Sequence, residues 1–74
     1  MPGTTGTGAI SDPGEVARLL RGGCALCGRA HSGFRRDARL GIWLAACGCR
    51  AIYQYQDGAS TPASIRWYRT PARR

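Results

Sequence analysis

The sequence predicts a small α+β domain stapled by a metal, with antiparallel β-hairpins and one short N-terminal helix. Three observations predict this class. The chain has 74 residues, and a domain of that length seldom gains enough stability from an apolar core alone. Its four cysteines form two close pairs, in "CALC" at 24–27 and "CGC" at 47–49. Two later stretches, 50–56 and 64–69, alternate in polarity as strands do.

The N-terminal part contains the predicted helix. Residues 1–10, "MPGTTGTGAI", are rich in Gly and Thr and are predicted to be disordered. A short helix is predicted over 11–22, where Asp12 suits the N-cap and Pro13 suits the first helical position. The apolar residues at helical spacing are Val16, Leu19 and Leu20. So short a helix is marginal alone, and we expect it to dock onto the rest of the chain.

Residues 23–69 are predicted to form a metal-binding β module, followed by a basic tail over 70–74. The segment 29–37 is typical of a polar loop or a short strand around Phe34. The segment 39–46 fits a strand or a helix, and we favour the strand because a clear strand follows it. As a strand residue, Trp43 faces away from its apolar neighbours, which makes it either a second small core or an exposed interaction anchor.

The two clearest strands have distinct faces. Alternation places Tyr53 and Tyr55 on one face of 50–56, and Ile65 and Trp67 on one face of 64–69. Pairing the strands would bury these four side chains together. The side chains then left facing outward are Arg50, Gln54, Gln56, Arg66 and Tyr68.

The cysteine spacing is C-x2-C, then 19 residues, then C-x-C. Four thiolates on two tight turns supply the soft, tetrahedral ligand set that zinc prefers, and the separation fits four-cysteine zinc sites. Gly28 after the first pair allows a sharp turn through positive φ. The second pair has one intervening residue where two are usual, so it makes fewer amide-to-sulfur bonds. The predicted ligands of one Zn²⁺ per chain are Cys24, Cys27, Cys47 and Cys49.

Other uses of the cysteines are open at this point. His31 lies close enough to Cys27 in sequence to replace Cys47 or Cys49 in a Cys3His site. An iron–sulfur cluster would suit the thiolates, although the spacing matches no ferredoxin-like run. Disulfides or a redox pair are a further alternative. Structural zinc is the favoured interpretation.

The chain resembles the zinc ribbon group on the residues "CALCG", "CGC" and the strands that follow them, within residues 23–69. Members of that group clamp one zinc between two cysteine turns at the ends of β-hairpins, and the resemblance implies the same role for the four cysteines here. In size, charge and cysteine layout the chain is also distantly similar to small zinc-bearing regulators encoded by bacteriophages.

The charge predicts the partner. The chain has eleven Arg, no Lys and a net charge of +7. Residues 1–22 sum to zero, so the excess lies in the cysteine module and its tail. Four thiolates and one Zn²⁺ would add −2, which leaves +5. We therefore expect binding to DNA or RNA, since arginine and glutamine contact phosphates and bases and tyrosine stacks on bases. The predicted contact residues are Arg35, Arg36, Arg39, Arg50, Gln54, Arg66, Tyr68 and Arg69.

The alternative function is a protein-interaction module that docks Trp43 and the arginines on an acidic partner protein. We do not expect an enzyme, because no nucleophile–base pair or carboxylate pair is visible and the single glutamate, Glu15, lies at the helix start. We expect no membrane partner and no small-molecule substrate. The cysteine usage and the lack of a signal-peptide pattern favour a reducing, cytoplasmic location.

Overall fold

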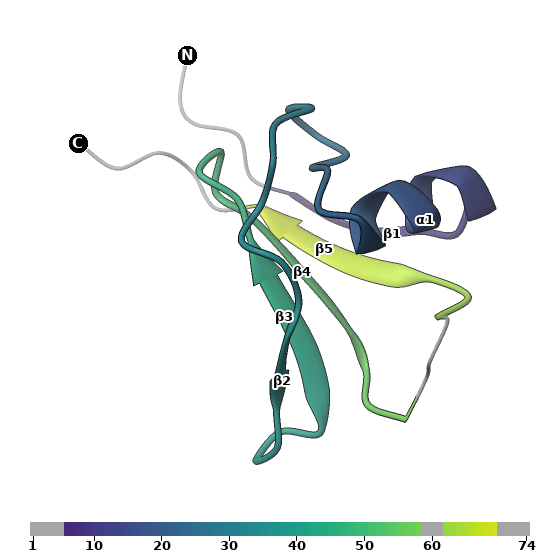
Figure 1. The fold of residues 1–74 in the computed structure, drawn as a ribbon, viewed down its shortest axis with the longest axis vertical. Coiled ribbons are helices and arrows are strands. Elements are labelled where there is room, and N and C mark those ends of the chain that lie inside the picture. The colour runs from purple at the N-terminus through teal and green to yellow at the C-terminus, as the bar shows by residue number, and fades with distance from the viewer. Residues whose placement is uncertain (1–5, 59–61, 70–74) are drawn as a thin grey trace.

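The described part of the protein combines one helix with one antiparallel sheet, as the α+β prediction requires. The computed structural model describes residues 6–58 and 62–69. Its elements are β1 (Gly6–Ile10), α1 (Pro13–Leu20), β2 (Arg35–Asp37), β3 (Ile42–Ala46), β4 (Ala51–Gln56) and β5 (Ile65–Arg69). The sheet has five strands in the order β1-β5-β4-β3-β2 (Figure 1). The predicted basic tail, 70–74, and residues 1–5 lie outside the described residues.

Helix α1 begins and ends close to the predicted positions. The carboxylate of Asp12 accepts a hydrogen bond from the Glu15 N–H at 3.1 Å, which confirms the N-cap. The helix stops at Leu20, two residues before the predicted end, and Gly22 follows with φ +106°. No helix among residues 6–58 and 62–69 is long and apolar enough to cross a membrane.

The helix packs on one face of the sheet and leaves the other face uncovered. Register partners Tyr53 and Trp67 lie on the covered face, which confirms that the predicted face is shared by β4 and β5. The buried residues packed together there are Ile10, Val16, Leu19, Cys24, Ala51, Tyr53 and Ile65. In Figure 1, α1 lies beside β1, and the loop after it runs to the end of the sheet where β3 turns into β4. We call the opposite side the helix-free face.

Of the region 39–46, residues 42–46 form strand β3, as favoured, whereas residues 39–41 belong to the turn that follows β2. Strand β2 is the short strand that the sequence left open. Trp43 and Tyr55 are register partners on β3 and β4, and their rings stack with centroids 5.9 Å apart at 7°. The Trp43 indole N–H donates to Asp57 at 3.1 Å. Trp43 is therefore half-buried beside Tyr55, which packs against the main core, and no separate second core forms among the described residues.

Strand β1 shows that the prediction of disorder is wrong for residues 6–10. Residues 1–5, the rest of that predicted segment, lie outside the described residues. Residues 6–10 pair with β5 along its whole length, from Gly6 opposite Arg69 to Ile10 opposite Ile65. The glycines that suggested disorder have a role in packing, because the Trp67 ring lies against Gly6 and Gly8 of β1. A Cβ on Gly8 would lie 2.7 Å from Trp67 Nε1 and 2.9 Å from Cε2. The glycine lets a large aromatic side chain lie across the edge strand.

Substitution of Gly8 by alanine is therefore expected to destabilise the fold by about 1–3 kcal/mol, the usual range for overpacking. The rigid indole cannot move aside without disturbing Tyr53 opposite it. Gly6→Ala is the matched control on the same strand, because its Cβ would lie 3.3 Å from Trp67. Urea denaturation of the zinc-loaded variants measures both effects. Equal midpoints for the two variants would contradict this account of β1.

Candidate metal centre

The first cysteine turn is closed by backbone hydrogen bonds on both sides. The Gly28 N–H donates to the Cys24 carbonyl at 3.0 Å, and the Cys24 N–H donates to the Arg29 carbonyl at 2.7 Å. Gly28 has φ +79°, which is the conformation that the sequence predicted for it. The turn therefore places Cys24 and Cys27 on one small loop, with Cys24 buried and Cys27 exposed.

The second turn joins β3 to β4. The Arg50 N–H donates to the Cys47 carbonyl at 3.0 Å, and the Cys47 N–H donates to the Ala51 carbonyl at 2.9 Å. Arg50 has φ +74°, a left-handed conformation that completes a three-residue hairpin loop. The prediction that Arg50 belongs to the strand is therefore wrong: β4 begins at Ala51, and Arg50 lies in the metal turn.

The fold brings all four cysteines together, as predicted. Their Sγ atoms lie within 4.8 Å of one another. Cys24 and Cys49 are 3.7 Å apart at sulfur, and Cys27 and Cys47 are 3.4 Å apart. Four sulfurs around a tetrahedral Zn²⁺, with bonds of about 2.3 Å, are about 3.8 Å apart. The separations fit such an ion and exceed a disulfide bond of about 2.05 Å.

The electrostatics of the cluster favour a cation at its centre. Burial would raise the pKa of the Cys24 thiol, but hydrogen bonds from the Tyr53 hydroxyl and from the backbone of Cys27 and Leu26 bring it down to about 6. The Cys49 N–H lowers the pKa of Cys47, yet burial and the neighbouring sulfurs raise it to about 12. One sulfur is thus stabilised as a thiolate at the expense of another. A divalent cation removes that conflict, because all four sulfurs can then be negative.

His31 does not take part in the alternative Cys3His site, because it makes other hydrogen bonds. Its Nε2 lies 2.7 Å from the Leu19 carbonyl, and its Nδ1 accepts from the Gly33 N–H at 2.9 Å. Since Nδ1 accepts, Nε2 carries the proton and donates to the last turn of α1. Both ring nitrogens are engaged away from the sulfurs, so the ligand set that the structure supports is the four cysteines.

The predicted nucleic-acid residues divide between the two faces of the sheet. Register places Arg35 beside Leu44, Leu44 beside Gln54 and Gln54 beside Arg66, all on the helix-free face. Tyr68 lies on the same face, opposite Ile52. Arg39 is exposed in the turn between β2 and β3, with its backbone N–H bonded to Asp37.

Arg36 and Arg69 lie on the other face, so the eight residues do not form one surface. Arg36 makes a bidentate ion pair with Asp57, with Nη2 2.6 Å from Oδ2 and Nε 3.0 Å from Oδ1. Arg69 Nε donates to the Cys49 carbonyl at 3.2 Å, beside the metal turn. Adjacent strand residues alternate in direction, so neighbours Arg35 and Arg36 point to opposite faces.

Two residues of the site carry no sequence signal of their roles. The Tyr53 hydroxyl contacts a cysteine sulfur, although the strand pattern identifies Tyr53 only as core. Asp57 follows strand β4, and its carboxylate joins Arg36 to Trp43. The hydrogen bond from Arg36 lowers the pKa of this carboxyl group. Both roles depend on strand register, which spacing alone does not give.

Comparisons with protein-family models, with curated proteins and with solved structures found no match to this chain.

Proposed function

We propose that this protein is a non-enzymatic, zinc-stapled module of the cytoplasm that binds nucleic acid on its helix-free face. The metal part is supported by the four-cysteine cluster. We assign the ion as Zn²⁺ and the two turns as zinc ribbon-like, because tetrahedral thiolate sites are typical of structural zinc. Four cysteines fill the coordination shell and leave no position for a reacting water, so the ion's role here is structural.

The observation that carries the nucleic-acid proposal is a row of side chains across the helix-free face. From β2 to β1 the row reads Arg35, Leu44, Gln54, Arg66 and Ala9. Neighbouring strands are about 4.8 Å apart, so the two guanidinium-bearing positions are about 14 Å apart along the row. A second, parallel row contains Ala46, Ile52, Tyr68 and Thr7. Cationic groups therefore lie beside an aromatic ring and apolar side chains.

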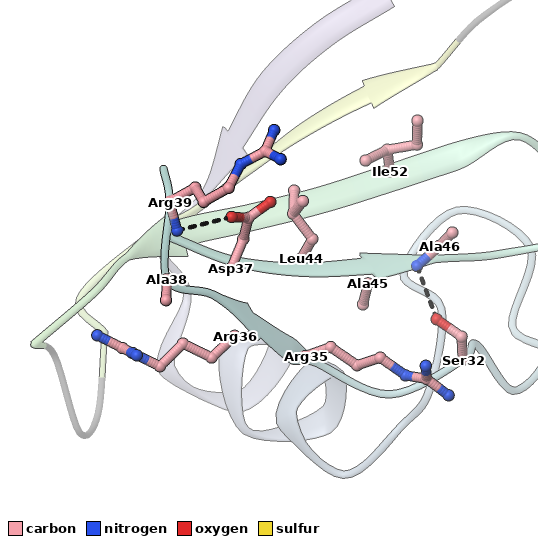
Figure 2. A pocket seen from close by; sticks show the side chains of 10 residues that line it. All are labelled: Ser32, Arg35, Arg36, Asp37, Ala38, Arg39, Leu44, Ala45, Ala46 and Ile52. Atoms are coloured by element: carbon pink, nitrogen blue, oxygen red, sulfur yellow. Dashed lines mark hydrogen bonds between the residues drawn. The ribbon is translucent and has the colours of Figure 1, made fainter. Parts of the chain in front are cut away.

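The face is also hollowed along these rows. A shallow hollow of about 500 Å³ lies at the β2 edge, lined by Arg35, Leu44 and Ile52 among others. Figure 2 shows Leu44, Ala46 and Ile52 on one side of the strands and Ala45 on the other. Two more hollows, of about 270 and 420 Å³, adjoin Arg66.

The chemistry of the face suits unpaired bases. An open sheet can carry stacked bases on aromatic side chains while arginines contact the phosphates. In the described part of the chain, no helix projects from this face into a duplex groove. The formal net charge of the chain is +7. Four thiolates and one Zn²⁺ contribute −2, so the net charge of the zinc-loaded protein is +5. That excess favours a polyanion and predicts strong salt dependence. We therefore propose single-stranded DNA or RNA as the ligand.

The test is a titration of fluorescently labelled single strands, in DNA and RNA form, with the zinc-loaded full chain. Tyr68→Ala is expected to weaken binding about tenfold or more, since one stacked base is worth about 1–3 kcal/mol. Arg66→Ala should weaken binding and reduce the salt slope by about 1. Arg21→Ala is the control, because it removes the same charge from the exposed end of α1.

The outcomes separate the possibilities. A change of less than twofold for the Arg21 variant, with the losses above, supports the proposal. Equal effects of Arg66→Ala and Arg21→Ala would mean that net charge alone drives binding. No binding by the wild-type protein at low salt would contradict the nucleic-acid function.

Apolar exposure on the same face favours one second candidate, the protein-interaction module. Ile52 is 38% exposed and lines the hollow at the β2 edge together with Arg35 and Arg39. An acidic partner with an apolar centre would fit such a surface. Binding to one protein that resists salt and is lost in Ile52→Asp would favour this candidate over nucleic acid.

A further inference from the structure

The Tyr53 hydroxyl is buried between the sheet and the first cysteine turn. The side chains of Tyr53 and Cys24 are both 0% exposed. The hydroxyl oxygen lies 3.0 Å from Cys24 Sγ and 3.2 Å from the Ala25 nitrogen. Tyr53 thus connects the centre of strand β4 directly to a sulfur of the metal cluster.

The direction of the hydrogen bond follows from counting donors. The Ala25 N–H can only donate, so the phenolic oxygen accepts that bond. A phenol has one proton, and Cys24 Sγ is the remaining partner within reach among the described residues. The sulfur is therefore the acceptor, as a metal-bound thiolate would be. Burial excludes the water that would otherwise solvate this sulfur.

We propose that Tyr53 is a positioning residue for the metal: its hydroxyl donates to the Cys24 sulfur, fixes the direction of that sulfur and offsets its negative charge. This inference rests on the metal-binding function proposed above. Partners of this kind commonly change metal affinity by about 10–100-fold. Among the described residues, no other side-chain hydroxyl contacts a cysteine sulfur, so this support acts on one ligand.

The experiment compares Tyr53→Phe with Tyr55→Phe in the full chain. Both variants lose one hydroxyl from the same strand and face, and the Tyr55 hydroxyl has no hydrogen-bond partner within the described ranges. Zn²⁺ affinity is measured by competition with a chromophoric chelator at fixed pH. Tyr53→Phe should bind Zn²⁺ about tenfold or more weakly, and Tyr55→Phe should stay within about twofold of wild type.

Two spectroscopic readouts distinguish positioning from packing. With Co²⁺, loss of the hydrogen bond should move the sulfur-to-cobalt charge-transfer band of Tyr53→Phe to lower energy and leave that of Tyr55→Phe unchanged. In wild-type protein loaded with ¹¹³Cd²⁺, the Tyr53 hydroxyl proton should exchange slowly and show scalar coupling to the metal across the sulfur. This second readout needs no variant, so it decides the matter even if Tyr53→Phe does not fold.

Equal Zn²⁺ affinities for the two variants, or a Tyr53 hydroxyl proton without coupling to cadmium, would overturn the positioning role. Such results leave metal binding itself intact, because wild type would still bind. Failure of the wild-type protein to bind Co²⁺ or Zn²⁺ would instead contradict the metal-binding function.

Discussion

Removal of the metal is expected to abolish the cooperative unfolding transition of this protein. The reason is the small size of the core, whose fully buried large side chains are Tyr53, Leu19, Ile65 and Cys24. Binding of structural zinc contributes about 10–16 kcal/mol in small zinc-binding peptides. The whole stability of a typical domain is about 5–15 kcal/mol. A bound Zn²⁺ would therefore supply a free energy of binding about as large as the whole stability of a typical domain.

The location of the cysteines strengthens this expectation. The first pair lies on the loop after α1, and the second pair lies on the hairpin between β3 and β4. Without a cation, four sulfurs within 4.8 Å cannot all be thiolates, as the opposite pKa shifts of Cys24 and Cys47 indicate. The apo state thus loses a cross-link between two distant segments and keeps unfavourable sulfur contacts.

The measurement is thermal unfolding by circular dichroism before and after chelation under reducing conditions. Chelated protein should show no sigmoidal transition, and added Zn²⁺ should restore it while Mg²⁺ should not. Cys24→Ser should behave like the chelated protein, because its buried position holds the Tyr53 contact. Cys27→Ser changes the exposed position, and this variant should lose less thermal stability than Cys24→Ser. A chelated sample that melts cooperatively near the wild-type midpoint would contradict the stapling role.

Much of the fold follows from local pattern, and the exceptions have physical causes. The caps of α1, the faces of β4 and β5 and the convergence of the four cysteines were all predictable, because each depends on residues close in sequence or on cysteine chemistry. Strand β1 was not. Two of its five residues are glycines, which disfavour strands, and the segment is ordered by pairing with β5 and by the Trp67 ring over Gly8.

The clustering of the cysteines was predictable, and the residues that surround the cluster were not. Alternation assigns a side chain to a face only when the strand is known, and β2 was left open. The faces of Arg35 and Arg36 could therefore not be assigned, and the structure separates them. The Tyr53–Cys24 contact needs the distance between two turns that are far apart in sequence. Such contacts come from tertiary packing, which composition and spacing do not specify.

Truncation of Leu19 to alanine is expected to cost about 2–5 kcal/mol, the range for removing a buried leucine. Leu19 is 0% exposed and packs with Val16 and the sheet residues of the core. The helix has eight residues and is too short to be stable alone, so its order depends on this docking. The Leu19 carbonyl keeps its bond to His31 in the variant, so the loss reports side-chain packing.

Leu20→Ala is the matched control, since Leu20 is 37% exposed and should cost less than about 1 kcal/mol. Urea denaturation of both zinc-loaded variants gives the comparison, and equal losses of stability would show that α1 does not dock through Leu19.

The same samples also test the separation of the two faces of the sheet. Because α1 covers the face opposite Arg66 and Tyr68, folded Leu19→Ala protein should bind a labelled single strand as wild type does. A loss of binding without unfolding would mean that the helix side takes part in recognition.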